Sequence, residues 1–78
     1  MWYVYFLKCY DDSIYTGCTH DLEERISRHN KGQVHYTCDK LPVELMTFIV
    51  FTNKYKAYKF EKYLKTASGI AFRNKRLI

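Results

Sequence analysis

The sequence predicts a small α+β domain in which a three-stranded, mostly antiparallel sheet is flanked by helices. Three observations indicate this class. Two apolar runs rich in aromatic and β-branched residues are joined by turn formers, a third such run follows later, and hydrophobic residues at helical spacing lie between and after them. The expected order is strand, strand, helix, strand, helix and a helical tail. A chain of 78 residues is the size of one domain, so we expect a single domain over residues 1–78.

The first two strands are expected at residues 2–7 and 14–18. The first run is apolar throughout, which is typical of a strand buried on both faces. Residues 11–13 are turn formers, so the second strand should pair antiparallel with the first as a hairpin. Gly17, near the end of the second strand, indicates a bulge or a close approach by another backbone or a ligand.

The first helix is expected to begin after Asp21, a good N-cap, and Glu24 completes a capping-box-like pair with it. It should end at residues 30–32, in a left-handed cap region. A polar loop over residues 33–42 follows. A third strand is then expected at residues 44–51.

The second helix is expected over residues 53–65 with Asn53 as its cap, and a basic tail over residues 68–78 can form a short last helix. Gly69 is expected to act as a breaker in this tail. The apolar stripe of the second helix consists of three residues at helical spacing, with Glu61 inside it, and these are Ala57, Phe60 and Leu64.

A carboxylate in an apolar stripe is costly unless a cation, a metal ion or hydrogen bonds receive it. The cation on another helix that best fits this role for Glu61 is Arg25. The tyrosines of the first two strands can complete a site beside this pair. Glu61 is therefore the residue that most strongly indicates function.

Net charge, cysteine content and hydropathy narrow the class of protein. The chain has 13 Lys and Arg against 8 Asp and Glu, and this net charge of +5 favours a polyanionic partner such as nucleic acid over simple solubility. The three cysteines form no C-x-x-C pair, which fits neither a zinc pattern nor a disulfide framework and suits a reducing compartment. The apolar start is too short to span a membrane and lacks a charged leader, so we expect a cytoplasmic protein with no membrane partner.

Two tripeptides, YVY at residues 3–5 and YTG at residues 15–17, resemble the signature tripeptides of the GIY-YIG nucleases. The tyrosines Tyr5 and Tyr15 lie ten residues apart, as in that family. The resemblance covers the whole chain and is closest to the family's stand-alone, single-domain branch, which is similar to the nuclease module of excision repair. In this resemblance Arg25 matches the family's arginine.

The resemblance implies a metal-dependent endonuclease that hydrolyses phosphodiester bonds of nucleic acid, with DNA favoured as the substrate and repair or recombination as the setting. Glu61 matches the family's metal-binding glutamate and would hold one Mg²⁺ or Mn²⁺ ion, with waters and phosphate oxygens as the other ligands. Arg25 would stabilise charge on the attacked phosphate. Tyr5 and Tyr15 would position the water, one of them as a base whose pKa of about 10 must be lowered by Arg25 and the metal.

Other residues are given site roles by the same resemblance. His29, one turn beyond Arg25, would assist proton transfer or contact phosphate. Gly17 would support the backbone near the site. The remaining expected nucleic-acid contacts lie in the loop and the tail, and they are His35, Tyr36, Thr37, Arg73, Asn74 and Lys75.

The chain departs from the family pattern at three positions. Tyr3 stands at the first signature glycine, Thr16 replaces isoleucine, and Cys18 stands where many members carry a lysine or another polar residue. The last change leaves the identity of the general base open. It does not affect the expected metal site.

Two other functions stay open at this point. One is a nucleic-acid-binding module without catalysis, in which the tyrosines only pack. The other is a structural domain in which Glu61 and Arg25 form a buried ion pair that fixes helix order. The choice between DNA and RNA is also open, and target selection can lie in the loop at residues 33–41, in an accessory protein or in a homodimer.

Overall fold

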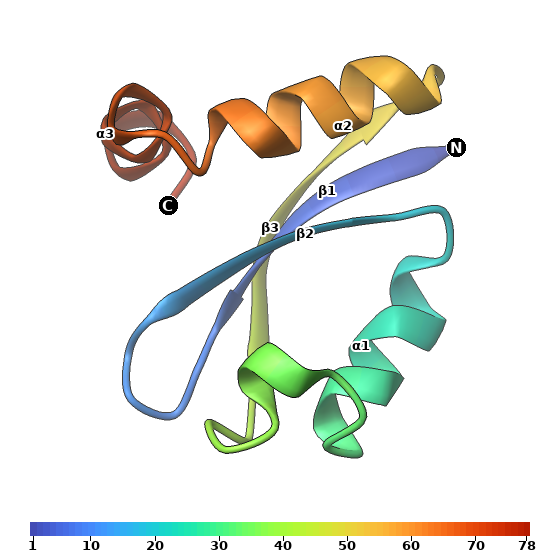
Figure 1. Cartoon of the computed structure of the whole chain (residues 1–78), viewed down its shortest axis with the longest axis vertical. Coiled ribbons are helices and arrows are strands. Elements are labelled where there is room, and N and C mark those ends of the chain that lie inside the picture. Colours follow the sequence, from blue (N-terminus) through green and yellow to red (C-terminus); the bar gives the residue numbers. More distant parts are fainter.

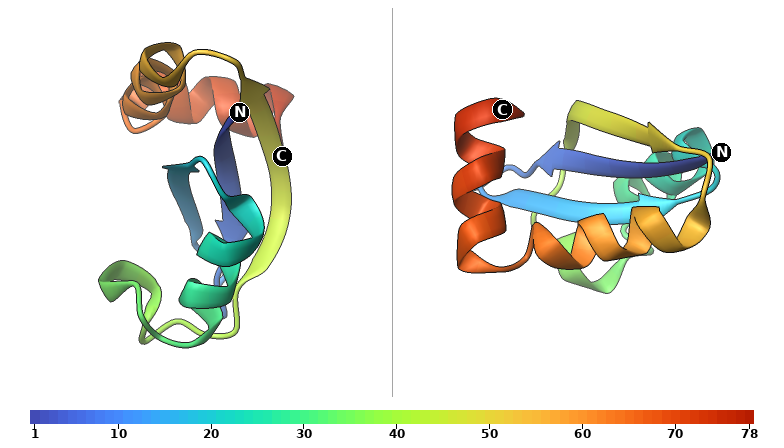
Figure 2. Two further views of the ribbon diagram at one scale, coloured as in Figure 1. Left: turned by 90° about the vertical axis from the view of Figure 1, so that its right-hand side faces the viewer. Right: turned by 90° about the horizontal axis from the view of Figure 1, so that it is seen from above.

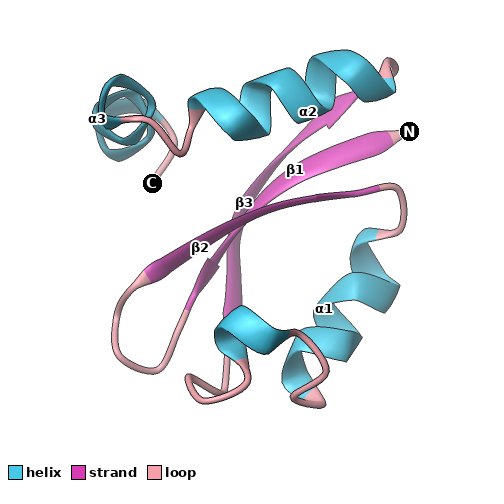
Figure 3. Ribbon diagram, in the orientation of Figure 1, coloured by secondary structure: helices cyan, strands magenta, loops and turns pink.

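The computed structural model describes residues 1–78, and its elements follow the predicted order (Figures 1 and 3). The strands β1 (Trp2–Lys8), β2 (Ile14–Thr19) and β3 (Glu44–Phe51) form one antiparallel sheet in the order β2-β1-β3. The predicted α+β class is therefore confirmed. Both expected strands of the hairpin are one residue longer than predicted, and β3 has the predicted bounds.

Helices cover both faces of the sheet (Figures 1 and 2). The helix α1 (Leu22–Asn30) and the short 3₁₀ helix η1 (His35–Thr37) lie on one face, and α2 (Lys54–Tyr63) lies on the other. The last helix, α3 (Ala67–Arg76), turns away from the direction of α2 and crosses its end (Figure 2). None of these helices combines the length and apolar character needed to cross a bilayer.

The central strand β1 contributes to both halves of the core, because its side chains alternate between the two faces. Val4 and Phe6 pack under α2, whereas Tyr5 and Leu7 pack under α1, and all four are fully buried. The prediction of a strand buried on both faces is confirmed. Residues paired across β1 and β2 point to the same face of the sheet. Cys18 pairs with Val4 and therefore lies on the α2 side.

Side-chain caps begin α1 and α2 where the sequence places them. The Asp21 carboxylate accepts a hydrogen bond from the Glu24 backbone N–H (3.1 Å), and Asn53 caps α2 in the same way. The expected reciprocal half of the capping box is wrong, because the Glu24 carboxylate approaches Arg28 instead (3.8 Å). At the other end of α1, Gly32 has a φ of +74°, which confirms the predicted left-handed cap region.

The expected loop over residues 33–42 contains one short regular element, η1. One expectation about the tail is wrong. Gly69 does not break the tail but lies buried inside α3, where the Thr66 hydroxyl accepts a hydrogen bond from its N–H (3.1 Å). The reason is a close approach: a Cβ at this position would lie 2.6 Å from the Tyr63 carbonyl carbon and 2.7 Å from the Cα of Leu64.

This contact predicts that Gly69→Ala destabilises the protein although alanine favours helix. The helix propensity gain is about 1 kcal/mol, but overpacking against a backbone that cannot move aside costs about 1–3 kcal/mol. We expect a lower midpoint in urea-induced unfolding followed by circular dichroism. Ser68→Ala, at an exposed neighbouring position of α3, is the control and should not lower the midpoint. A Gly69→Ala midpoint equal to or above the wild-type value would contradict the packing argument.

Candidate active site

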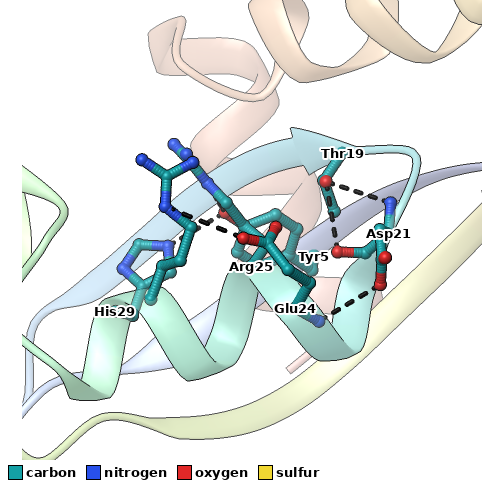
Figure 4. A network of polar contacts seen from close by, with 7 residues as sticks. Tyr5, Thr19, Asp21, Glu24, Arg25 and His29 are labelled. Carbon is teal, nitrogen blue, oxygen red and sulfur yellow. Dashed lines mark hydrogen bonds and ion pairs between the residues drawn. The ribbon is translucent and has the colours of Figure 1, made fainter.

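Three of the expected site residues meet beneath α1. Tyr5 points from β1 toward this helix, and its hydroxyl lies 3.0 Å from Nε2 of His29. Nε of Arg25 donates a long hydrogen bond to the same hydroxyl (3.4 Å), as the close-up in Figure 4 shows. Arg25 and His29 are one helical turn apart, so one face of α1 brings both to the same phenol.

Gly17 makes room for the Tyr5 ring. The two residues are direct partners in the β1–β2 register, and a Cβ on Gly17 would lie 2.8 Å from Cε1 of Tyr5. The close approach that the sequence indicates is therefore real, but it comes from a side chain and not from a backbone or a ligand. A glycine at this position is what allows the phenol to lie flat across β2.

His29 is held from both sides in a fully buried position. Its Nδ1 lies 2.7 Å from the Thr37 hydroxyl, which also lies within 3.5 Å of the Val34 carbonyl. If Thr37 donates its only proton to this carbonyl, Nδ1 of His29 is a donor and Nε2 accepts from the Tyr5 hydroxyl. Thr37, expected among the nucleic-acid contacts, is itself fully buried, and its hydroxyl contacts His29 and not the solvent.

Burial keeps the Tyr5–His29 pair neutral. It raises the pKa of the Tyr5 phenol well above its ordinary value, and the hydrogen bond from Arg25 only partly opposes this effect. Burial also lowers the pKa of His29 to about 4, with the positive charges of Arg25 and Arg28 adding to the shift. Arg25 lowers the pKa of Tyr5, as expected, but burial has the larger effect. The expectation that Tyr5 or Tyr15 acts as a base with the help of a metal ion stays a prediction.

Tyr15 is the more accessible of the two phenols. It is half-buried on β2, with its ring centroid 4.9 Å from that of His29 and 6.1 Å from that of Tyr5. Its other side faces Tyr36 of η1, 5.5 Å away. Tyr36 is 57% exposed, and its neighbour His35 is also exposed. The aromatic groups thus form a continuous row from the buried phenol to the surface.

Glu61 lies in the apolar stripe of α2, as predicted, with its side chain 18% exposed. Its ion-pair partner is Lys65, whose Nζ is 3.2 Å from Oε2, and the expected pairing with Arg25 is wrong. The physical reason is that α1 and α2 lie on opposite faces of the sheet (Figure 1). The Glu–Lys spacing of four residues in a helix was the sequence signal for the observed pair.

The strand β2 is an edge strand with no neighbour on its outer side. Side chains from both faces of the sheet can therefore reach this edge. A groove of about 450 Å³ at this edge is lined by Arg25 of α1, Cys18 of β2 and Tyr58 of α2. Burial, together with the charge of nearby Glu61, raises the pKa of the Cys18 thiol to about 11. Arg25 and Glu61 therefore flank the same strand edge without touching.

The residues around Glu61 suit a single hard cation. Nowhere in the chain do three or more His, Cys, Asp or Glu side chains cluster as metal ligands, so a multidentate protein cage is not formed. Mg²⁺ commonly binds through one or two carboxylates and keeps several waters, and a lone, partly exposed carboxylate meets that requirement. Lys65 is exposed, with 56% of its side chain accessible. Because ion pairs to exposed lysines contribute little to stability, a metal ion can take the place of Lys65 beside Glu61.

The three residues of the tail that are expected to contact nucleic acid, Arg73, Asn74 and Lys75, all lie in α3. Arg73 is half-buried and donates two hydrogen bonds to Oδ1 of Asn74 (3.1 and 3.0 Å). Asn74 and Lys75 are exposed. Arg73 also lines a cavity at the β2 edge together with Tyr15 and Tyr36, so the structure brings these three together, whereas Asn74 and Lys75 stay on the surface.

This fold and site define a nuclease class. Residues 1–75 match the sequence profile of the GIY-YIG catalytic domain, and the chain belongs to the GIY-YIG family of nucleases.

Within that family the relatives are UPF0213 proteins, a stand-alone branch. A UPF0213 protein of Clostridium perfringens is 50% identical over 64 residues, which cover 81% of this chain and 69% of that protein. One of Haloquadratum walsbyi is 40% identical over 65 residues, covering 82% and 73% respectively. The solution NMR structure of a UPF0213 protein from Bacillus halodurans superposes with a TM-score of 0.60 at 33% identity, covering 96% of this chain and 84% of the other.

The buried imidazole predicts a pH dependence of stability. His29 has a pKa of about 4 when folded and an ordinary value of 6.5 when unfolded. Above pH 6.5 the His29 imidazole is neutral in both the folded and the unfolded state. Between pH 6.5 and about 4 only the unfolded state binds a proton on this imidazole, so the free energy of unfolding falls as the pH is lowered. Urea midpoints measured across this window should fall for the wild type.

The control for this pH dependence is His29→Gln, in which the titrating group is absent. Its urea midpoint should be lower at neutral pH, because the imidazole contacts to Tyr5 and Thr37 are lost. The midpoint should then change less than the wild-type midpoint between pH 6.5 and 4. Equal slopes for the two proteins would contradict the assignment of the shift to His29.

Proposed function

We propose that the protein is a metal-dependent endonuclease that hydrolyses phosphodiester bonds, with DNA as its substrate. Membership of the GIY-YIG family supports nucleic acid as the substrate class. The observation that carries the proposal is the arginine held at the β2 edge: Tyr5 engages Nε of Arg25, which leaves the terminal nitrogens able to fork onto a phosphate oxygen. A guanidinium held in this way is available to bind a phosphate.

In the reaction, a water oxygen forms a bond to phosphorus and the water gives up one proton. The P–O bond to the leaving oxygen breaks and that oxygen takes up one proton, so that one water is consumed for each bond cleaved. Arg25 stabilises the negative charge that develops on the non-bridging oxygens. Tyr5 stays protonated and orients Arg25, while His29 and Thr37 hold Tyr5 in place. Tyr15 is the phenol that reaches solvent, so it orients the attacking water.

Glu61 is the residue that would hold the ion, in place of its contact with Lys65. A bound Mg²⁺ or Mn²⁺ would supply Lewis-acid polarisation of the phosphate and a more acidic water. This role would explain why a carboxylate is kept in an otherwise apolar stripe of α2. It also accounts for the position of Glu61 near the exposed edge of β2 and not deep in the core.

Replacement of Glu61 tests the proposal. Glu61→Ala should reduce Mg²⁺- or Mn²⁺-dependent cleavage of a labelled DNA panel by about a hundredfold or more, because the polarising ion is lost. The panel should contain single-stranded, duplex and branched DNA, with RNA versions of each. Glu23→Ala, which removes an exposed carboxylate of α1, is the matched control and should cut like the wild type. Equal cleavage by wild type and Glu61→Ala would remove Glu61 from the mechanism.

One observation favours a second candidate function, a nucleic-acid-binding module without catalysis. Cys18 stands where many GIY-YIG nucleases carry a lysine, and with a pKa of about 11 its thiol is neutral and supplies no charge. Divalent ions discriminate between the candidates. Cleaved strands in the presence of Mn²⁺ support the nuclease, whereas intact, shifted DNA under the same conditions supports the binding module.

Under either function, the exposed cations of α3 are proposed to contact phosphate. Lys75→Ala should weaken DNA binding equally for all sequences and reduce the slope of log affinity against log salt by about 1. Fluorescence anisotropy over a range of salt concentrations measures this slope. Lys59→Ala, on the exposed face of α2, is the control; an identical change in slope for both variants would argue against a specific α3 contact.

The setting of the activity is proposed to be DNA repair or recombination. The groove at the β2 edge contains no element comparable to a separate sequence reader. We therefore propose that an accessory protein or a second copy of the chain contributes to target choice.

A further inference from the structure

A second cavity, of about 300 Å³, opens at the β2 edge next to Tyr15. Its walls come from β2, η1, the short link between α2 and α3, and α3, so residues far apart in sequence surround it. Eight residues line it, most of them aromatic or aliphatic, together with two cations; the lining includes Ile14, Tyr15, Tyr36, Ile70, Lys65 and Arg73. Such a mixture of apolar walls and a few charged groups is typical of a ligand site.

The apolar part of this cavity is accessible to solvent. Tyr36 is 57% exposed and Ile70 is 39% exposed, although burying either elsewhere would have been favourable. The Tyr36 ring lies beside the Tyr15 ring at a tilt of 44°. Exposed rings that border a cavity indicate a surface for contact with a flat, apolar group.

The charges around the cavity specify the other half of the ligand. Arg73 and Lys65 line it, and Nζ of Lys40 lies 4.1 Å from the centroid of the Tyr36 ring. No aspartate or glutamate is among the lining residues. A ligand that is flat and apolar on one side and anionic on the other is a nucleotide.

The cavity adjoins the set of residues around Tyr5. Tyr15 is common to both, because its ring faces Tyr36 on one side and His29 on the other, and His29 binds the Tyr5 hydroxyl. A nucleotide in the cavity would therefore be close in the strand to the phosphate that Arg25 receives. This adjacency distinguishes the cavity from a remote binding surface.

We propose that this cavity receives one unstacked nucleobase of the strand being cut, with its phosphate toward Arg73 and the base on the Tyr36 ring, where it takes the place of Nζ of Lys40. The inference rests on the proposed function and names its substrate class. In a continuous duplex both faces of a base are covered by neighbouring bases, and unstacking one costs free energy. The substrate is thus a nucleic acid with unpaired nucleotides at the cleavage position, such as a single strand, a frayed end or a flap.

Binding without cleavage tests this inference separately from the nuclease activity. In EDTA, anisotropy of a labelled single-stranded oligonucleotide and of the matching blunt duplex is measured with wild type, Tyr36→Ala, Tyr36→Phe and Tyr55→Ala. Tyr36→Ala should weaken single-strand binding about tenfold, the loss typical of one base–aromatic stack, and leave duplex binding unchanged. Tyr36→Phe keeps the ring and should bind like the wild type.

Tyr55→Ala is the matched control, because Tyr55 is 74% exposed on α2 and lines no cavity. Unchanged single-strand binding by Tyr36→Ala, or an equal loss for single strand and duplex, would overturn the inference. A second measurement needs no variant: 2-aminopurine placed along the single strand should be quenched at one position on binding wild type. The same fluorescence at every position would overturn the inference as well.

The outcomes also separate the two levels of the proposal. Ring-dependent single-strand binding without cleavage by the wild type would leave the base cavity standing and contradict the endonuclease. Metal-dependent cleavage without any effect of Tyr36→Ala on binding would support the endonuclease and contradict the base cavity.

Discussion

The buried hydroxyl of Tyr5 is the group around which the site is organised. A phenol oxygen inside a core must be hydrogen-bonded, because an unpaired polar group there costs free energy that a chain of this size cannot readily lose. The Tyr5 hydroxyl makes hydrogen bonds to His29 and Arg25. The other ring nitrogen of His29 makes a hydrogen bond to Thr37. No buried side-chain nitrogen or oxygen lacks a partner. The position of the arginine at the strand edge thus depends on core packing, and not on surface contacts.

The sheet divides the chemistry between its two faces. Arg25, Tyr5 and His29 lie on the face of the sheet that α1 covers, while Glu61 belongs to α2 on the other face, near Cys18. Only a strand with a free outer edge allows groups from both faces to reach one ligand, and β2 is such a strand. The shortness of the chain is compatible with this arrangement, because one three-stranded sheet supports both layers. A substrate strand would lie along the β2 edge, between the α1 layer and the α2–α3 layer.

Much of the fold could be predicted because its signals are local. The unbroken apolar run that became β1, the caps Asp21 and Asn53, and the helical stripe with Glu61 each depend on neighbouring residues only. The role of Gly69 could not be predicted from its neighbours in the sequence. A glycine is needed there because the backbone at the end of α2 packs against α3, and this contact exists only in the folded chain.

The site also has features that the sequence predicts and features that depend on the folded structure. The spacing of Tyr5, Tyr15 and Arg25 follows from the resemblance to a family, but the state of Tyr5 does not, because desolvation depends on what packs over the ring. Likewise, the sequence contains nothing that would link Thr37 to His29 and not to a phosphate, since that contact is made by a loop folding back under α1.

The pairing of Tyr5 with Gly17 has a consequence for how the two signature tripeptides should be understood. The ring of the first occupies the space that a side chain of the second would need. A larger residue at position 17 would displace the phenol from its helix, and a small residue at position 5 would leave a void above the glycine. The two tripeptides are therefore one steric unit, and grafting this centre onto another scaffold requires that both be transferred together.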